Sequence, residues 1–314
     1  MKHALTAAVA AFCLNGCTMA ENDPSAAPPS PASAGEPARD IMVWDDLLSR
    51  PQPEPDHRIA YGEGDLQFSE LWLPIVDGIP ASGHPTVLMI HGGCWQTDIA
   101  ERDIMNWIAG DLRDRGIAVW NIEYRGVDRE GGGWPGTYED VLAAAASLVE
   151  NAGRYNLDIS NTVAIGHSAG GHLALWLAAR QSALPGNGAL DIVRLPIGTV
   201  ISQGGLPDLE AGTRREGHAC GTEAPRLLMG ENPTLTSPQR MPAPSAHQIL
   251  VNGARDRIAP PDYAEAYRNA NLARDVTDIA LVTIPDEGHV ELISPGTAAW
   301  ERQVELIEEA LGRR

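Results

Sequence analysis

The stretch TVAIGHSAGGHLALWLA at residues 162–178 decides the fold. Its first four residues are apolar and predict a buried strand, the residues from Gly171 onward predict a helix, and Ser168 lies in the tight turn between them. Gly166 and Gly170 have no Cβ, so strand and helix can approach closely and the turn can hold the serine above the sheet edge. A serine hydroxyl becomes a good nucleophile only beside a base. The stretch therefore predicts an exposed nucleophile at a sheet edge.

A second apolar run, at residues 86–90, ends in the turn HGGCW at residues 91–95. A turn of this kind can direct backbone N–H groups outward. Donors fixed in advance where negative charge develops on oxygen stabilise that charge by about 3–4 kcal/mol each when water is excluded. We expect the donors to be two amides of this turn and the amide that follows the serine, while His91 braces the turn. The predicted oxyanion residues are Gly92, Gly93, Cys94 and Ala169.

A base and an orienting acid follow two further apolar strands in the last third of the chain. Asp256 comes after the run at residues 248–252, and His289 comes after the run at residues 279–284. Loops that follow parallel strands lie at one edge of a sheet, so Ser168, Asp256 and His289 are predicted to meet as a catalytic triad. The alternatives are a surface aspartate paired with a neighbouring arginine and a loop histidine without a catalytic role.

Six motifs of the chain resemble those of the α/β-hydrolase superfamily, in its esterase, lipase and kynurenine-formamidase-like branch: HGGCW, EYRG, GWPGTYEDV, GHSAGGHLALWLA, GARDRIAPP and EGHVELI. The resemblance implies triad roles for Ser168, Asp256 and His289, and oxyanion roles for the HGGC loop. Members of the hormone-sensitive-lipase type usually read HGGG and GDSAG, whereas this chain has Cys94 and His167 at the differing positions. That departure argues against this subgroup and leaves the acyl preference open.

Apolar strands alternate with helical patterns from Ile59 to the end of the 314 residues, which predicts one α/β domain over residues 46–314. The expected architecture is the α/β-hydrolase fold: a mostly parallel central sheet flanked by helices. The pattern breaks at about 204–246, after the sixth strand, where glycines and prolines accumulate, and this segment is predicted to form a small cap over the site. We expect Trp95, Trp134 and His167 to contact the substrate.

The N-terminus is predicted to be a targeting segment. A basic start and a short apolar run suggest a lipoprotein-type signal peptide over residues 1–16, and the run is too short to span a bilayer. The sequence LNGC at residues 14–17 resembles a lipobox, which predicts lipidation of Cys17 and a Pro/Ala/Ser-rich tether over residues 17–45. The alternative is plain cleavage after Ala20. Both interpretations predict an exported bacterial protein, lipid-anchored on the periplasmic side or soluble in the periplasm or outside.

Charge and cysteine content restrict the partners. The chain has 42 acidic against 23 basic residues, a net charge of −19, so nucleic-acid binding has no electrostatic basis, and membrane contact is expected through the lipid anchor only. The mature chain would keep Cys94 and Cys220, as a disulfide or as two buried thiols. We find no metal-ligand spacing and no phosphate-binding loop, and therefore expect no cofactor. The sequence does not indicate an oligomeric state.

These observations predict a serine hydrolase that cleaves short-to-medium carboxylic esters through an acyl-enzyme on Ser168. A cap of this modest size favours small acyl or alcohol groups. An amide or peptide hydrolase with the same triad, such as an aryl formamidase or a single-domain exopeptidase, is the alternative that the HGG-x-W turn motivates. A third hypothesis is an inactive, surface-anchored binding module, because a fold alone never proves activity.

Overall fold

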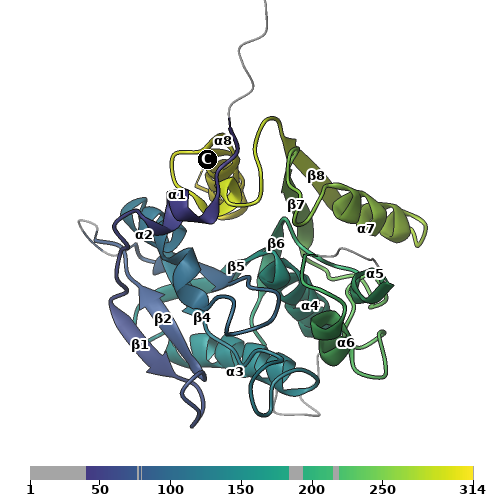
Figure 1. Ribbon diagram of the computed structural model, residues 1–314. Coiled ribbons are helices and arrows are strands. Elements are labelled where there is room, and N and C mark those ends of the chain that lie inside the picture. The colour runs from purple at the N-terminus through teal and green to yellow at the C-terminus, as the bar shows by residue number, and fades with distance from the viewer. Residues whose placement is uncertain (1–39, 76–77, 79, 184–193, 215–218, 314) are drawn as a thin grey trace, which may run out of the picture. The chain divides into compact units, whose positions relative to one another are not determined.

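The computed structural model describes residues 40–75, 78, 80–183, 194–214 and 219–313 (Figure 1). Internal contacts divide the chain into residues 1–38 and residues 39–314, and the second unit is described here. The predicted signal peptide, the lipidation at Cys17 and the tether as far as residue 39 lie outside the described residues. Within the described residues, no helix is both long and apolar enough to cross a membrane.

An eight-stranded sheet forms the centre of the second unit (Figure 1). Its strand order is β1-β2-β4-β3-β5-β6-β7-β8; β1 and β2 pair antiparallel to their neighbours, and the six others run parallel. The prediction of a mostly parallel sheet is confirmed. The strands are β1 (His57–Ala60), β2 (Phe68–Trp72), β3 (His84–Ile90), β4 (Ala118–Ile122), β5 (Leu157–His167), β6 (Ile197–Gln203), β7 (His247–Gly253) and β8 (Ile279–Ile284).

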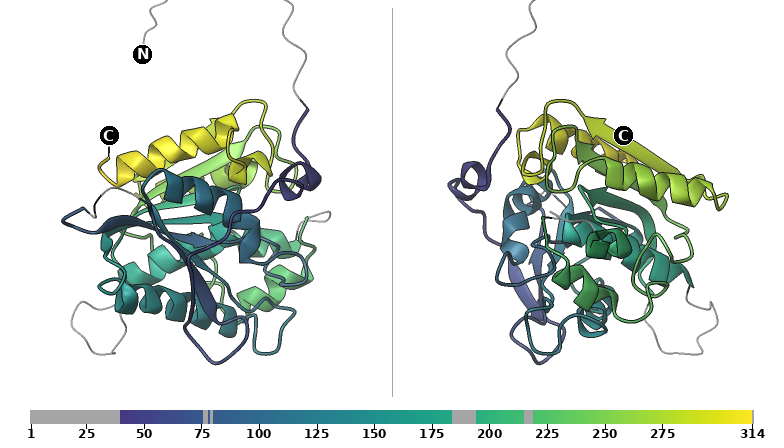
Figure 2. Two further views of the ribbon diagram at one scale, coloured as in Figure 1. Left: turned by 90° about the vertical axis from the view of Figure 1, so that its left-hand side faces the viewer. Right: turned by 45° about the vertical axis from the view of Figure 1, so that its right-hand side comes forward.

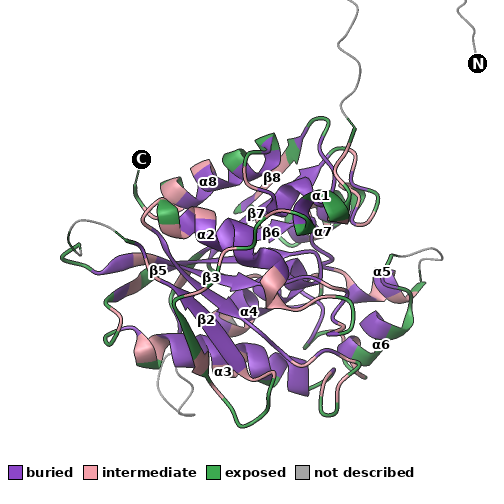
Figure 3. Ribbon diagram, turned by 60° about the vertical axis from the view of Figure 1, so that its left-hand side comes forward, coloured by how far each residue is buried: buried purple, intermediate pink, exposed green. Residues whose placement is uncertain are grey.

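Helices cover both faces of the sheet, which is why the central strands are apolar along their length rather than alternating (Figure 3). One hydrophobic core contains residues of α3, α4 and α7, and the other contains residues of α1, α2 and α8. The helices are α1 (Trp44–Leu48), α2 (Asn106–Asp114), α3 (Gly136–Asn151), α4 (Ala169–Ala183), α5 (Leu209–Arg214), α6 (Glu223–Met229), α7 (Asp262–Leu272) and α8 (Ala298–Ala310), with short 3₁₀ helices η1 (Arg102–Met105) and η2 (Glu291–Ile293).

The insertion after β6 carries α5 and α6 and returns to the sheet at β7 (Figure 2). A disulfide between Cys94 and Cys220, with the two Cα atoms 5.1 Å apart, joins it to the HGGC turn. Of the two states left open for these cysteines, the structure therefore contains the bridge. The bridge links the insertion covalently to a turn at the carboxyl end of β3.

Residues 40–45, which the sequence assigned to the tether, contact the body of the domain. The amide of Met42 donates a hydrogen bond to a carboxylate oxygen of Glu291 (2.5 Å), and α1 follows directly. Leu47 is fully buried in the core that α2 and α8 share. The chain therefore joins the folded body before the predicted boundary at residue 46, because Met42 and Trp44 pack against the core.

Candidate active site

The turn after β5 holds Ser168 in the left-handed region, at φ 54°, which is a strained conformation for a residue with a side chain. The glycines on either side of this turn are required because a larger residue would clash with neighbouring backbone atoms. A Cβ on Gly166 would lie 2.1 Å from the carbonyl oxygen of Gly170, and a Cβ on Gly170 would lie 2.2 Å from that of Ile90. The Ser168 amide donates to the Gln203 carbonyl at the end of β6 (2.8 Å). Close packing and this bond fix the serine at the sheet edge.

His289 and Asp256 form a buried pair in the loops after β8 and β7. Nδ1 of His289 lies 2.6 Å from Oδ2 of Asp256, and both residues are at most 5% exposed. The other oxygen of Asp256 accepts hydrogen bonds from the amides of Ile258 (2.8 Å) and Ala259 (2.9 Å). A carboxylate fixed in this way orients the imidazole and leaves its Nε2 for other partners. The structure pairs Asp256 with this histidine, as the triad prediction requires.

The turn after β3 has three successive residues with positive φ: Gly93 (98°), Cys94 (54°) and Trp95 (57°). The indole of Trp95 donates to the carbonyl of Ala169 (3.1 Å), which ties this turn to the serine turn. Among the described residues, no group accepts a hydrogen bond from the amides of Gly93, Cys94 or Ala169. Gly92 brings the turns close together, since a Cβ there would lie 3.1 Å from the Cβ of Ser168.

His91 braces this turn from behind. Its Nδ1 lies 2.7 Å from the Gly92 carbonyl oxygen, its Nε2 lies 2.9 Å from Oε1 of Glu123, and its ring stacks on Tyr124. Burial tends to raise the pKa of Glu123, but the charge and hydrogen bond of His91, with two backbone amides, outweigh burial and lower that pKa. A buried carboxylate that remains ionised keeps the histidine, and with it the turn, in place.

His167 supports the loop of His289. Its Nε2 lies 3.2 Å from the His289 carbonyl oxygen, and the two rings are 4.4 Å apart between centroids. Burial, reinforced by the charge that His289 can carry, lowers the pKa of His167 well below its usual value. The neutral ring then donates from Nε2 to that carbonyl, and within the described residues its Nδ1 has no partner.

A cavity of 320 Å³ opens beside Ser168 and His289, and both residues line it. His167, which the sequence predicts to contact the substrate, lines this cavity as well. Most of the remaining walls are apolar side chains, which come from α1, the loop before η1, η1 itself and the loop after β7. They are Trp44, Leu48, Ile99, Ala100, Ile104 and Ile258. Ala219 is the one described residue of the insertion among the lining residues.

The structure differs from the sequence prediction for two substrate-contacting residues. Trp95 is 1% exposed and packs edge-on to His172, away from the cavity, because its backbone conformation turns the indole inward. Trp134 is 40% exposed and packs against Tyr138 and the backbone of Gly230. Neither is among the described residues that line the cavity of Ser168. Trp44, assigned to the tether, lines it instead; the apolar run at residues 41–44 was the signal available in the sequence.

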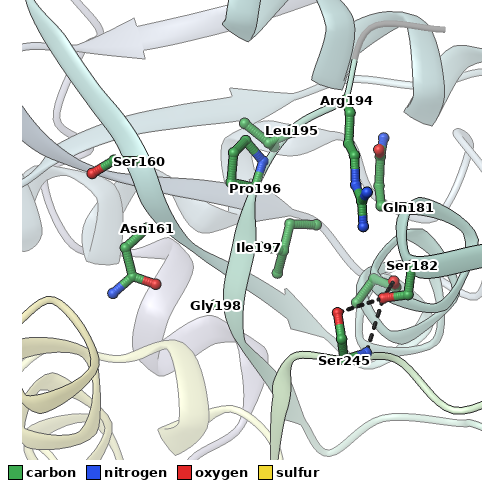
Figure 4. A pocket seen from close by; sticks show the side chains of 11 residues that line it. Ser160, Asn161, Gln181, Ser182, Arg194, Leu195, Pro196, Ile197, Gly198 and Ser245 are labelled. Carbon is green, nitrogen blue, oxygen red and sulfur yellow. Dashed lines mark hydrogen bonds between the residues drawn. The ribbon is translucent and has the colours of Figure 1, made fainter. Parts of the chain in front are cut away.

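A larger cavity, of 430 Å³, lies at the opposite edge of the sheet, where β5 and β6 begin (Figure 4). Among its walls, Ser182 and Ser245 hydrogen-bond to each other (3.1 Å) and Arg194 extends toward them (Figure 4). No described residue that lines it is a histidine, so its serines have no base there. Size alone therefore does not identify the reactive site, whereas the pairing of His289 with Asp256 does.

We predict that His172 makes stability depend on pH. The residue is fully buried, its Nε2 lies 2.8 Å from the Thr236 carbonyl oxygen, and burial lowers its pKa from 6.5 to about 4. The unfolded chain binds the proton more readily, so this contribution is present above pH 6.5 and is lost as the pH falls toward 4. The loss is roughly 3 kcal/mol. Denaturant unfolding at pH 7 and pH 4 measures it.

The matched variant for this measurement is His172→Gln, which keeps an N–H donor for Thr236 and cannot titrate. The difference in unfolding free energy between the wild type and this variant should shrink or reverse as the pH falls. An equal pH dependence of the two proteins contradicts the assignment to His172.

A mostly parallel sheet with a serine, an aspartate and a histidine at the carboxyl ends of β5, β7 and β8 defines the α/β-hydrolase class. The model of the BD-FAE family matches residues 76–265, more than half of the chain. The chain therefore belongs to BD-FAE, an α/β-hydrolase esterase family, and is a carboxylic ester hydrolase. The matched range includes Ser168 and Asp256; His289 lies beyond it and is placed by the structure.

Solved structures of esterases share this fold. A truncated carbohydrate esterase from gut microbiota is 20% identical, with a TM-score of 0.63, covering 83% of this chain and 97% of that one. Esterase B of Lactobacillus rhamnosis is 18% identical, with a TM-score of 0.69 and coverages of 86% and 91%. Esterase Est2 of Thermogutta terrifontis is 21% identical, with a TM-score of 0.62 and coverages of 81% and 91%. At such identities the likeness shows the fold alone. A search of the curated proteins gave no match.

Proposed function

We propose that this protein cleaves short-to-medium carboxylic esters through an acyl-enzyme on Ser168. One observation carries the proposal. His289, whose Nδ1 lies 2.6 Å from Oδ2 of Asp256, lines the same 320 Å³ cavity as Ser168. Beside it lie the amides of Gly93, Cys94 and Ala169, which donate to no acceptor among the described residues. A nucleophile, an oriented base and hydrogen-bond donors for an oxyanion are the three components that acyl transfer requires.

The reaction proceeds in two halves. The Ser168 Oγ attacks the ester carbonyl while Nε2 of His289 takes its proton, and the carbonyl oxygen gains the negative charge that the three amides stabilise. Asp256 holds the imidazole in the tautomer with the proton on Nδ1 and stabilises the imidazolium. The carbon–oxygen bond to the alcohol then breaks, and His289 gives its proton to the leaving oxygen. Water, deprotonated by the same histidine, hydrolyses the acyl-enzyme and returns Ser168 to its hydroxyl form.

The walls of the cavity support a neutral, apolar group of modest size. Apart from the residues of the proposed mechanism and His167, the side chains that line it in the described part of the chain are uncharged and mostly apolar. Its volume of 320 Å³ is near the lower end of the range for small-molecule sites, which is about 300–1,000 Å³. An acyl chain of a few carbons fits this description better than a long fatty-acyl chain.

Purified protein should hydrolyse p-nitrophenyl acetate and butyrate faster than the matched anilides, measured as kcat/KM at neutral pH. The amide bond needs a protonated nitrogen leaving group, and the cavity offers no additional described acid for it beside His289. A formyl-aryl-amide and a dipeptide anilide complete the comparison. A higher kcat/KM on any of these amides than on the esters would overturn the ester assignment in favour of an amide hydrolase.

The disulfide gives a further prediction, because Cys94 supplies one proposed oxyanion amide and Cys220 follows the cavity residue Ala219. The variant Cys220→Ser frees this turn from the insertion. We expect kcat on p-nitrophenyl butyrate to fall by about tenfold or more, since one misplaced oxyanion donor costs roughly 10²–10³. The thermal midpoint should also fall as the cross-link is lost.

A change in KM without a change in kcat would contradict the proposed role of the disulfide in holding the oxyanion turn. Treatment of the wild type with a reductant should reproduce the effect of Cys220→Ser, and the same reductant should leave the variant unchanged. The variant thus serves as the control for any unrelated action of the reductant.

We also propose that the protein is exported and held at a membrane surface by lipidated Cys17, or released into the periplasm. The Cys94–Cys220 bridge supports export, because disulfides persist in oxidising compartments. Mass spectrometry of the N-terminal peptide from the native host distinguishes a diacylglyceryl-modified Cys17 from a chain that begins after Ala20.

A further inference from the structure

Residues 40–48, which we term the N-terminal arm, contribute Trp44 and Leu48 to the lining of the Ser168 cavity. At its start, the Met42 amide donates to Oε1 of Glu291 (2.5 Å); near its end, Leu47 is fully buried. Just beyond the arm, Nη1 of Arg50 donates to the Pro295 carbonyl (3.1 Å). Three attachments within nine residues hold the arm against the domain.

Glu291 ties the arm to the loop of His289. Its Oε1 accepts from Met42, its Oε2 accepts from the Gly288 amide (3.1 Å), and the residue is only 2% exposed. A buried carboxylate with both oxygens bonded to backbone amides is a rigid link. The arm therefore has a defined position relative to the proposed base.

Trp44 of the arm stands between two cavities. Its indole lies edge-on to the rings of His167 (6.2 Å between centroids, 81°) and His289 (6.3 Å, 82°). On one side is the 320 Å³ cavity of Ser168, and on the other is a cavity of 160 Å³. Trp44, Ile258 and His289 line both cavities and so form the wall between them.

The smaller cavity continues the apolar character of the larger one. Its other walls include Ile41, Val43 and Val290, with Arg255 and Arg257 at the side of the loop after β7. The indole of Trp44 is the largest side chain of the dividing wall. Without it, the space beside Ser168 would continue into the smaller cavity along apolar side chains.

We propose that Trp44 sets the upper length of the apolar chain of the ester that this enzyme accepts. The proposal rests on the proposed function, because it assigns a specificity role at the same serine site. A chain that grows from the reacting carbon fills the larger cavity and then meets the indole. Each further methylene must remain outside the protein or displace Trp44, so it adds no binding energy.

The test compares the wild type with Trp44→Ala on two ester series. In one, p-nitrophenyl esters extend the acyl chain from acetate to laurate; in the other, alkyl acetates extend the alcohol. For the wild type, kcat/KM should stop rising at a modest length. In Trp44→Ala the chain length with the highest kcat/KM should increase. Each methylene that newly enters the smaller cavity should raise kcat/KM by roughly fourfold. The series that shifts identifies the half of the ester that lies against Trp44.

Val43→Ala is the matched control. Val43 is the neighbouring residue of the arm and is 60% exposed. It lines the smaller cavity but not the cavity of Ser168. Its truncation to alanine enlarges the smaller cavity but leaves Trp44 in place between the two cavities. The dependence of kcat/KM on chain length should therefore match that of the wild type. Equal shifts in Val43→Ala and Trp44→Ala would overturn the proposal, because they would indicate a general loosening of the arm.

Unchanged profiles of Trp44→Ala in both series would also overturn the proposal. Trp44→Phe, which has a smaller ring, should shift the preferred chain length by an intermediate amount. This variant keeps the test available if Trp44→Ala does not fold. Labelling of Ser168 by a fluorophosphonate probe separates the two levels of the argument. A variant that is labelled but keeps the wild-type profile contradicts the role of Trp44 alone, whereas absence of labelling in the wild type contradicts the proposed function.

Discussion

Ser168→Ala should lower kcat/KM for p-nitrophenyl butyrate by at least about 10⁴-fold while the fold is retained, because no acyl-enzyme can form. The residue that replaces serine still occupies a φ of 54°, so the strain of the turn is unchanged and the thermal midpoint should stay close to that of the wild type.

The measurement is steady-state hydrolysis together with circular dichroism and thermal unfolding of both proteins. Retention of ester hydrolysis within tenfold of the wild type would contradict the nucleophile assignment. The inactive-module hypothesis predicts negligible hydrolysis in both proteins, and it is rejected by turnover in the wild type that the substitution abolishes.

Asp256→Asn should lower kcat by about 10³–10⁴-fold with little change in KM. The asparagine can still accept from the amides of Ile258 and Ala259, but it presents N–H rather than a carboxylate oxygen to Nδ1 of His289. The imidazole then carries its proton on Nε2 and cannot take the proton of Ser168. The loss follows from the tautomer, so the structure of the variant should be almost that of the wild type.

Asp286→Asn is the matched control for this variant. It removes one carboxylate from the loop that carries His289, at an exposed position whose φ of 59° asparagine accommodates well. It should retain kcat within about twofold. Equal losses in the two variants would show that the net negative charge near the imidazole, rather than the bond from Asp256, controls the rate.

The sequence predicted the parts of the site that short-range sterics determine. Gly166 and Gly170 sit where any Cβ would collide with a carbonyl oxygen, and the strand before them is apolar on both faces. The positions of Asp256 and His289 after successive parallel strands follow from topology in the same way. Such features are visible in the order of residue types, because few other arrangements satisfy them.

The walls of the cavity could not be predicted in this way. The sequence predicts substrate contacts for Trp95 and Trp134, yet the direction of a side chain depends on backbone conformation and packing that the sequence does not encode locally. Trp44 contacts the cavity only because the arm packs against Glu291, a residue 247 positions beyond it in the chain. Contacts of this kind belong to the tertiary structure.

The same distinction applies to Cys94 and Cys220. Composition permitted a bridge between these cysteines but left two buried thiols as the alternative, because the distance between two residues 126 positions apart is not given by the sequence. In the folded chain the insertion after β6 returns to the turn after β3, and this return brings the two Cα atoms within 5.1 Å. Among the described residues of the insertion, Ala219 lines the cavity of Ser168 and Cys220 attaches the insertion to the turn after β3.

The central claim is that Ser168, activated by His289 and Asp256, attacks the ester. The most direct test is to incubate the wild type and Asp256→Asn with a fluorophosphonate and to map the adduct by peptide mass spectrometry. We predict stoichiometric modification of Ser168 in the wild type, at a rate at least about 10²-fold above that of Asp256→Asn. Modification at another residue, or an equal rate in the two proteins, would contradict it.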